Sequence, residues 1–274
     1  MTTHPSWLHL THGDTPLIVS MPHTGTDIPP ELETRFVSPW LARKDADWWV
    51  HLLYDFAPTL GATMVRTSLA RSVIDVNRDP SGRSLYPGQA TTELCPTTSF
   101  DGEPLYREGE LPGAEEIAER RDAYFMPYHT ALDAEIARLR VRHGRVVLFE
   151  AHSIRSRIPR LFDGELPNFN IGTNSGASCA AQLTSAIEQV CDNSTFTHVT
   201  NGRFKGGYTT RHHGEPNKGV HAVQLELAMR GYLDEPEFPA PENWPTPYDT
   251  DRAAPMRAIL KRILETCLNF ASTT

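Results

Sequence analysis

The sequence contains neither a long apolar run nor an excess of positive charge. No stretch approaches about 18 consecutive apolar residues, and residues 1–7 lack the basic start that precedes the apolar part of a secretory signal. We therefore expect neither a membrane span nor a secretory signal. The formal net charge is −8, whereas proteins that bind phosphate backbones usually carry a basic surface. The composition thus argues against a nucleic-acid partner.

Cysteine is also scarce. The four cysteines are widely separated and include no CxxC pair, so we expect neither a disulfide framework nor a structural zinc site. Each is better explained as a small buried hydrophobic residue than as a nucleophile or a ligand. They are Cys95, Cys179, Cys191 and Cys267. A reducing cytoplasm is the expected location.

The chain does have enough apolar material for a folded core. Hydrophobic residues make up 39% and charged residues 22% of its 274 positions, a balance typical of a globular protein. This length fits one α/β domain, and no internal repeat or interdomain linker is visible. We predict a single domain over residues 1–274.

Short apolar runs alternate with helical patterns along the chain. The runs predict strands at residues 16–21, 62–67, 72–76, 145–149 and 220–227. The helical patterns predict helices at residues 47–57, 115–143, 178–190 and 253–270, with Asp47 opening the first and Pro127 bending the second. This alternation predicts an α/β fold with a mixed, mostly parallel central sheet flanked by helices. Ligands bind such sheets at the carboxyl ends of the strands.

Two loops have compositions that indicate a function. Residues 79–113 are rich in proline, glycine, threonine and serine, and this segment is too long for a plain connection, so it could cover a site. Gly206 and Gly207 precede Tyr208, which indicates a loop with unusual backbone angles.

Several polar residues near the predicted strand ends could bind a metal. His23 follows the first strand, although a single loop histidine more often only donates a hydrogen bond. His152 follows the strongly apolar residues 145–149, where packing explains a histidine poorly. Asp47 could supply a carboxylate, cap a helix, or exchange roles with Asp45. Two imidazoles and one carboxylate would form a hydrolytic site, with zinc expected and cobalt or manganese as alternatives.

Glu226 is the candidate general base. In the segment VQLEL, strand alternation places Glu226 on the face opposite Leu225 and Leu227. It could be an ordinary solvent-facing carboxylate. A sheet covered by helices rarely leaves a strand face open, however, which favours a carboxylate with a function. Such a group can take a proton from an activated water and pass it to a departing amine.

Arginines near the strand ends indicate an acidic ligand, because a guanidinium binds a carboxylate through two parallel hydrogen bonds. Arg78 is the best candidate, since Asn77 adds an amide at the same strand end. The other candidates are Arg71, Arg155 and Arg211. Surface ion pairs are the preferred explanation for Arg157 and Arg160.

Seven segments between Pro16 and Asp234 together resemble the N-formylglutamate deformylases of histidine breakdown. In order they are PHTGTDIP, DADWW, RSVIDVNRDP, PLYREGELP, EAHSIRSRIPRLFDGELP, GTNSGASC and GGYTTRHHGEPNKGVHAVQLEL. The resemblance implies a zinc-carboxypeptidase-like (phosphorylase/hydrolase-like) fold, also similar to that of acyl-amino-acid deacylases. It implies hydrolysis of N-formyl-L-glutamate to formate and L-glutamate.

The resemblance also implies roles for individual residues. His152 resembles the second histidine ligand, Asn77 and Arg78 the pair that grips a substrate carboxylate, and Glu226 the catalytic glutamate. The chain departs from the carboxypeptidase pattern at Thr26, where a glutamate ligand would stand, and Asp47 is our choice to replace that ligand. Relatives often carry histidine at the position of Trp49 and aspartate at that of Glu150.

Two other functions stay open at this point. The chain could be a deacylase of another N-acyl or N-formyl amino acid that uses the same machinery. It could also be a carboxylate-binding protein that performs no chemistry, which the presence of both metal ligands and a base makes the weaker hypothesis.

Overall fold

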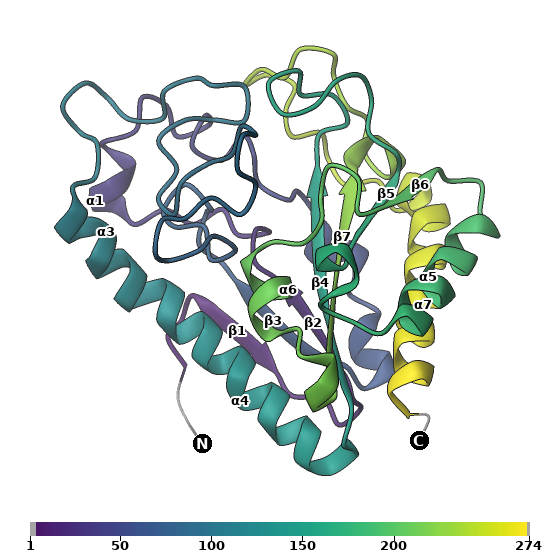
Figure 1. The fold of residues 1–274 in the computed structure, drawn as a ribbon. Coiled ribbons are helices and arrows are strands. Elements are labelled where there is room, and N and C mark those ends of the chain that lie inside the picture. The colour runs from purple at the N-terminus through teal and green to yellow at the C-terminus, as the bar shows by residue number, and fades with distance from the viewer. Residues whose placement is uncertain (1–3, 273–274) are drawn as a thin grey trace.

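Seven strands form one mixed sheet in the computed structural model, which describes residues 4–272 (Figure 1). The sheet order is β1-β3-β2-β4-β7-β5-β6. The strands are β1 Leu8–Thr11, β2 Leu17–Met21, β3 Thr63–Thr67, β4 Val146–Ile154, β5 Phe169–Gly172, β6 His198–Thr200 and β7 Val220–Ala228. β1 pairs antiparallel to β3, and β5 pairs antiparallel to β7, while every other pairing is parallel. The predicted mixed, mostly parallel sheet is therefore confirmed.

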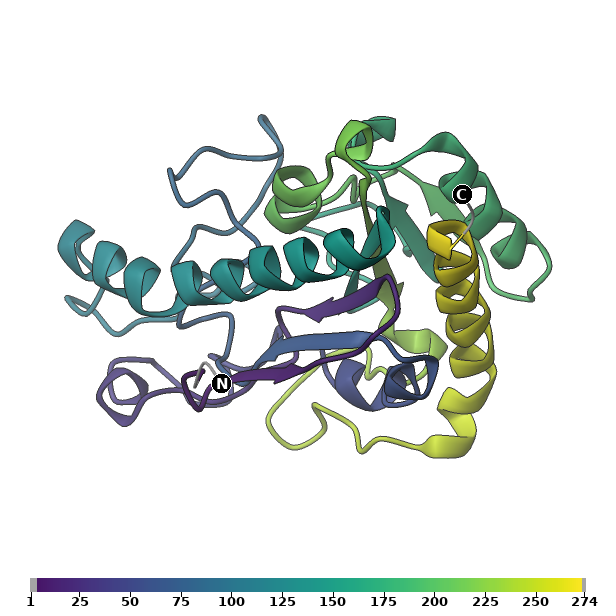
Figure 2. The same cartoon turned by 90° about the horizontal axis from the view of Figure 1, so that it is seen from below.

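Helices cover both faces of the sheet. They are α1 Pro30–Glu33, α2 Val50–Leu53, α3 Ala114–Arg120, α4 Met126–His143, α5 Ala181–Asp192, α6 Tyr208–His213 and α7 Thr250–Ser272. Figures 1 and 2 show α4 along one face, whereas α5 and α7 lie together against the other. Within residues 4–272, no helix is long and apolar enough to cross a membrane.

The two central strands divide their side chains between two cores and a polar site. On β4, Val147 packs into the core beneath α7, and Leu148 packs into the core beneath α4. Alternate side chains of a strand share a face, so the face of Leu148 continues into Glu150 and His152. β7 pairs with β4 in parallel register and places Glu226 beside His152. The apolar start of each strand anchors it, and its end presents polar side chains.

The prediction of a strand at residues 72–76 is wrong. The segment is buried but forms a turn without ladder pairing. The Asp75 carboxylate accepts the backbone N–H of Asn77 at 2.9 Å, and the N–H of Arg78 bonds the carbonyl of Asp75. Such local bonds replace those of a strand. The β-branched residues of the segment serve burial, not pairing.

The helix predicted at residues 47–57 is shorter and begins later. α2 starts after Trp49, whose φ of 62° is left-handed, and a 3-10 turn follows at Ala57–Leu60. Asp47 does not cap this helix: its Oδ2 accepts the backbone N–H of Ser153 on β4 at 3.2 Å. The left-handed residue lets the chain turn Asp47 toward the sheet.

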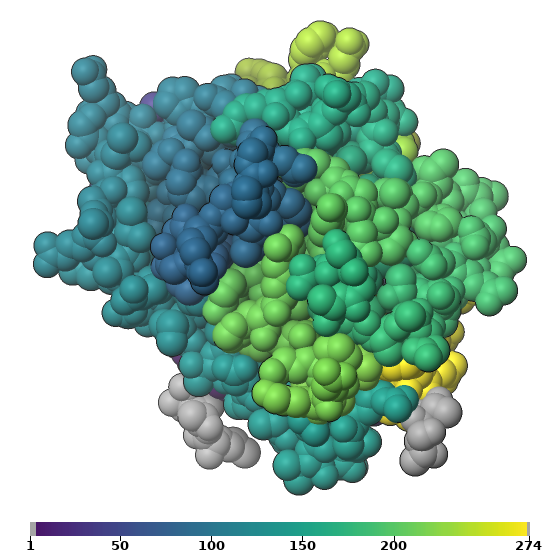
Figure 3. Space-filling view, viewed as in Figure 1, coloured from purple at the N-terminus to yellow at the C-terminus, as the bar shows by residue number. Residues whose placement is uncertain are grey.

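The remaining predicted helices are present with shifted ends. A π-helical turn, Arg121–Phe125, divides the helix predicted at residues 115–143. Pro127 has no N–H to donate to the carbonyl four residues earlier, as a continuous α-helix requires. Gly144 ends α4 with a φ of 76°. Residues 79–113 contain no helix or strand, which agrees with the predicted loop. Figure 3 shows this loop, in blue, against the green surface of the region near residue 206.

Candidate active site

His23, Asp47 and His152 form a buried group that could hold a metal ion. Their ligand atoms all lie within 4.8 Å of one another. Asp47 Oδ2 is 3.0 Å from His152 Nδ1 and 3.8 Å from His23 Nδ1. His23 follows β2, His152 lies on β4, and Asp47 precedes α2, where its backbone N–H bonds the carbonyl of His23 at 2.9 Å. Three separate elements thus deliver the three candidate ligands to one point.

The outward-facing nitrogens of both histidines are held by other polar groups. His23 Nε2 lies 2.7 Å from Asp75 Oδ1. His152 Nε2 lies 3.3 Å from Glu150 Oε1 and 3.1 Å from Asn77 Nδ2. A metal-binding histidine usually has its second nitrogen fixed in this way, which orients the ring and settles its tautomer. Each ring therefore turns Nδ1 toward the common point.

The donor set fits a divalent metal. Two imidazoles and one carboxylate leave a coordination position for water. Asp47 Oδ1 is buried and has no hydrogen-bond partner among the described residues, although Arg71 Nη1 lies 3.9 Å away, and a buried carboxylate oxygen without a hydrogen bond is costly. A cation at the triad would satisfy this carboxylate. Asp45, the alternative carboxylate, instead contacts Arg155 and the N–H of Phe100, and it lies outside the triad.

The pKa values of the two histidines are shifted in opposite directions. Burial, reinforced by Arg71, lowers the pKa of His23, so this ring is neutral. Burial opposes the charge of His152 as well, but Glu150 and Asp47 hold the pKa of His152 well above its ordinary value. Metal binding at this triad would therefore displace a proton from His152, because a ligating imidazole must be neutral at the ligating nitrogen.

Glu226 lies beside the triad on the neighbouring strand. Its Cα pairs in register with His152, and Gln224 pairs with Glu150 two positions earlier. Gln224 Nε2 donates to Glu226 Oε2 at 3.3 Å. Burial raises the pKa of Glu226 to about 7, although the nearby His152 opposes the shift. A carboxyl with this pKa can both accept and return a proton near neutral pH.

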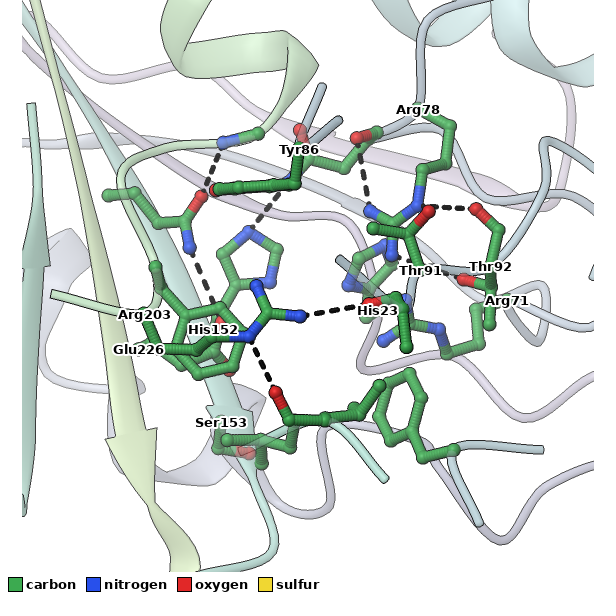
Figure 4. A pocket seen from close by; sticks show the side chains of 18 residues that line it. His23, Arg71, Arg78, Tyr86, Thr91, Thr92, His152, Ser153, Arg203 and Glu226 are labelled. Atoms are coloured by element: carbon green, nitrogen blue, oxygen red, sulfur yellow. Dashed lines mark hydrogen bonds between the residues drawn. The ribbon is translucent and has the colours of Figure 1, made fainter. Parts of the chain in front are cut away.

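A pocket opens over the triad (Figure 4). Its lining includes His23, His152 and Glu226, together with three of the predicted substrate-binding residues. These three are Asn77, Arg78 and Arg71. Arg78 donates to the backbone and side chain of Thr92, each at 3.1 Å.

Two other predicted arginines lie outside the lining of this pocket. Arg155 forms ion pairs with Asp45 at 3.2 Å and Asp101 at 2.6 Å. Arg211 donates to the carbonyl of Gly206 and lies over the ring of Tyr86. Both guanidinium groups serve the surrounding structure.

The surface role expected of Arg157 and Arg160 is only half right. Arg157 forms an exposed ion pair with Glu165 at 2.7 Å, as predicted. Arg160 instead donates to the backbone carbonyls of Ser99 and Phe100. Its partners are carbonyls and not a carboxylate, so this guanidinium fastens the loop of residues 79–113.

The glycine pair of residues 206 and 207 is required by the site. Gly206 has a φ of 109°, which favours glycine. A Cβ on Gly207 would lie 2.3 Å from the Asn77 amide. The N–H of Gly207 donates to Gln224 at 2.7 Å, and that of Thr209 donates to Asn77 Oδ1 at 2.9 Å. This loop therefore locks Asn77 against the sheet.

Sequence patterns missed Asp75, Tyr86 and Arg203. Asp75 lies in a segment predicted as a strand and contacts His23, 52 positions away. Tyr86 and Arg203 line the pocket from two loops, where no periodicity marks either residue. The neighbouring glycine pair was the nearest signal.

Comparisons with known proteins give matches over most of the chain. A model of the family described as N-formylglutamate amidohydrolase matches residues 15–233. The chain is 46% identical over 262 residues to an N-formylglutamate deformylase of Pseudomonas aeruginosa, covering 95% of this chain and 96% of the relative. It is also 46% identical over 257 residues to an N-formylglutamate deformylase of Pseudomonas putida, covering 93% of each chain.

Two solved structures share the fold. The first is an N-formylglutamate amidohydrolase from Ralstonia eutropha, with a TM-score of 0.74, 20% identity, and coverage of 97% of this chain and 98% of that one. The second is a gene product from Agrobacterium tumefaciens, with a TM-score of 0.72, 17% identity, and coverage of 98% of this chain and 97% of that one. Both likenesses extend over nearly the whole chain.

Proposed function

This chain belongs to the N-formylglutamate amidohydrolase family, and on that premise we propose that it hydrolyses N-formyl-L-glutamate to formate and L-glutamate. The observation that carries the proposal is the convergence of His23, Asp47 and His152 at one point beside the buried Glu226. Both curated relatives are named N-formylglutamate deformylases. The donor set supports zinc as the proposed metal, the cysteine spacing supports a cytoplasmic location, and the family resemblance supports a place in histidine breakdown.

A divalent metal bound by His23, Asp47 and His152 would polarise the formyl carbonyl and activate the attacking water. Glu226 then has two tasks. It accepts a proton from the water as the new C–O bond forms, and it delivers that proton to the amide nitrogen as the C–N bond breaks. Gln224, which donates to Glu226 Oε2, holds the carboxylate toward the pocket.

Asn77, Arg78 and Arg71 form the proposed carboxylate-binding side of the pocket. Asp75 lies behind them: its Oδ2 is 2.6 Å from Arg71 Nη2 and 3.5 Å from Arg78 Nη2. This shared buried carboxylate fixes both arginines before a substrate arrives, which reduces the entropy lost on binding. The two guanidinium groups then need little rearrangement to receive an anionic ligand.

Turnover of related substrates tests the specific activity. We expect efficient hydrolysis of N-formyl-L-glutamate, and much slower hydrolysis of N-acetyl-L-glutamate and N-formyl-L-methionine. Equal rates on all three would refute the assignment to N-formylglutamate and would leave a general deacylase. No turnover of any, with ligand affinity unaffected by Glu226→Gln, would favour a binding protein instead.

Metal content and activity of His152→Ala test the site itself. The matched control is His221→Ala, which removes another buried histidine near the start of the neighbouring strand β7. We expect the control to retain metal and activity, whereas His152→Ala loses both. Full metal content and full activity in His152→Ala would overturn the proposed site.

A further inference from the structure

Three arginines line the pocket, and they differ in whether a carboxylate of the protein neutralises their charge. Arg71 and Arg78 both contact Asp75. Arg203 lines the same pocket and forms no ion pair with any carboxylate of residues 4–272. Because a half-buried charge without a counter-ion is costly, this guanidinium is the natural receptor for an anion from outside.

The protein holds the Arg203 side chain in place without neutralising it. Nε donates to the carbonyl of Leu161 at 2.8 Å, and Nη2 donates to the carbonyl of Ala90 at 2.9 Å. The guanidinium also lies 5.2 Å from the ring centre of Phe204 and 5.4 Å from that of Tyr86. A guanidinium has five N–H donors, and Nη1 makes no hydrogen bond within the described part of the chain. The guanidinium of Arg203 is therefore held in one orientation, and its remaining N–H donors can bind a ligand.

The surroundings of Arg203 suit a short apolar chain that ends in a carboxylate. Ile154, Leu161 and Phe204 line the same pocket, and each has an apolar side chain. Figure 4 shows Arg203 within the pocket that His152 and Glu226 also line. Burial lowers the pKa of Arg203, so an anionic ligand would stabilise its charged form. Methylene groups could pack on the apolar residues while the carboxylate meets the guanidinium.

We propose that Arg203 binds the side-chain carboxylate of the substrate and thereby sets the preference for an acidic amino acid. The inference rests on the proposed function and deepens it. Asn77 and Arg78 would hold the α-carboxylate, so that two anchors at different points of the pocket fix the formyl group over the metal triad. Two separated anchors align the scissile bond better than one.

Arg203→Met and Arg211→Met form a matched pair of test variants. Both arginines lie over the ring of Tyr86, at 5.4 and 5.0 Å, but only Arg203 lines the pocket. Methionine keeps the apolar stem and removes the charge. The substrates are N-formyl-L-glutamate and N-formyl-L-glutamine, which differ only in the side-chain carboxylate.

For Arg203→Met we expect kcat/KM on N-formyl-L-glutamate to fall by about 100-fold or more. On N-formyl-L-glutamine it should change by less than about threefold, because this substrate has no side-chain carboxylate that could form an ion pair with the guanidinium. Arg211→Met should leave the ratio of the two values as in the wild type. An unchanged ratio in Arg203→Met, including an equal loss on both substrates, would overturn the proposal.

A binding measurement separates this inference from the proposed function. Calorimetric titration with L-glutamate, carried out on the metal-loaded proteins, should show affinity about 100-fold weaker in Arg203→Met than in the wild type. If the wild type binds L-glutamate in this way but does not hydrolyse N-formyl-L-glutamate, the proposed function fails and the Arg203 site stands. If Arg203→Met binds L-glutamate as well as the wild type does, the Arg203 site fails.

Discussion

Replacing Asp75 by asparagine should weaken metal binding without touching a proposed ligand. The Asp75 side chain is fully buried and accepts from His23 Nε2 at 2.7 Å and from Arg71 Nη2 at 2.6 Å. Arg78 Nη2 lies 3.5 Å away. An amide oxygen could still accept from His23, but the amide nitrogen would then face donors. The variant cannot satisfy both sides of this site.

The expected size of the effect follows from these contacts. Loss of a group that orients a ligating histidine typically weakens metal affinity by about 10–100-fold, or about 1.4–2.7 kcal/mol. Removal of one partner from a buried ion pair destabilises a fold by about 3–5 kcal/mol. The metal-free variant should therefore be less stable than the metal-free wild type by an amount of this order at pH 7.

The stability difference should depend on pH in a defined direction. Burial opposes ionisation of Asp75, but Arg78, His23 and Arg71 hold the pKa of Asp75 well below its ordinary value. A carboxyl whose pKa is depressed by folding stabilises the protein above its unfolded pKa of about 3.9 and loses that contribution as pH falls further. The gap between wild type and variant should therefore persist above about pH 4 and shrink in stronger acid.

The assay combines competition with a metal chelator, which gives the dissociation constant, and urea unfolding of the metal-free proteins, which gives stability. Asp122→Asn is the control, since Asp122 is exposed and its ion pair within residues 4–272 is with its neighbour Arg121; a change within about 0.5 kcal/mol is expected there. If Asp75→Asn binds metal as tightly as the wild type, Asp75 does not orient His23, and the assignment of His23 as a ligand loses its support.

Four further predictions concern the base, its pH dependence, the metal and acid stability. Glu226→Gln should lower kcat by about 10²–10⁴-fold and retain the metal, as activity and metal analysis would show; unchanged kcat would exclude Glu226 as the base. Since a base must be ionised, wild-type kcat/KM should fall as pH drops below about 7. A bound cation would shift this fall in kcat/KM to lower pH. A kcat/KM that does not change with pH would contradict the role of Glu226 as the base. Chelation should abolish activity and lower the melting temperature, because the buried Asp47 Oδ1, which has no hydrogen bond among the described residues, loses the bound cation; equal melting curves would count against the site. Burial lowers the pKa of His221 to about 4, so the neutral ring costs stability as pH falls from about 6.5 toward 4; His221→Gln should flatten that decline in unfolding scans, and an identical decline would refute this cause.

The sequence was most informative where strands are buried on both faces. β4 begins with the apolar run VVLF, and β7 alternates apolar residues with Gln224 and Glu226. Because helices cover both sides of the sheet, polar residues in these strands needed an explanation, and this marked His152 and Glu226. The short strands β1, β5 and β6 carried no comparable run. β6 is only partly buried, and strands of this kind are defined by pairing with a neighbour. Local patterns do not encode such pairing.

Contacts between distant positions limited what could be predicted about the site. Asp75 reads as part of an apolar run, and only folding brings it to His23. Arg203 donates to the carbonyl of Ala90, 113 positions earlier, from a loop with no periodicity. Arg155 lies near a strand end, as the candidate ligands do, yet three-dimensional structure pairs it with Asp45 and Asp101. Proximity to a strand end identified candidates without ranking them.

The division of β4 and β7 into an apolar start and a polar end has an evolutionary consequence. Glu226 and His152 alternate along their strands with residues of the core, so a substitution that moves either strand disturbs stability and chemistry together. Tyr86 and Arg203 lie in loops outside the sheet, so substitutions there can accumulate without disturbing the strands. Divergence within this lineage should therefore preserve the hydrolytic step and change which acyl amino acids are accepted, through exchanges in the loops around these two residues.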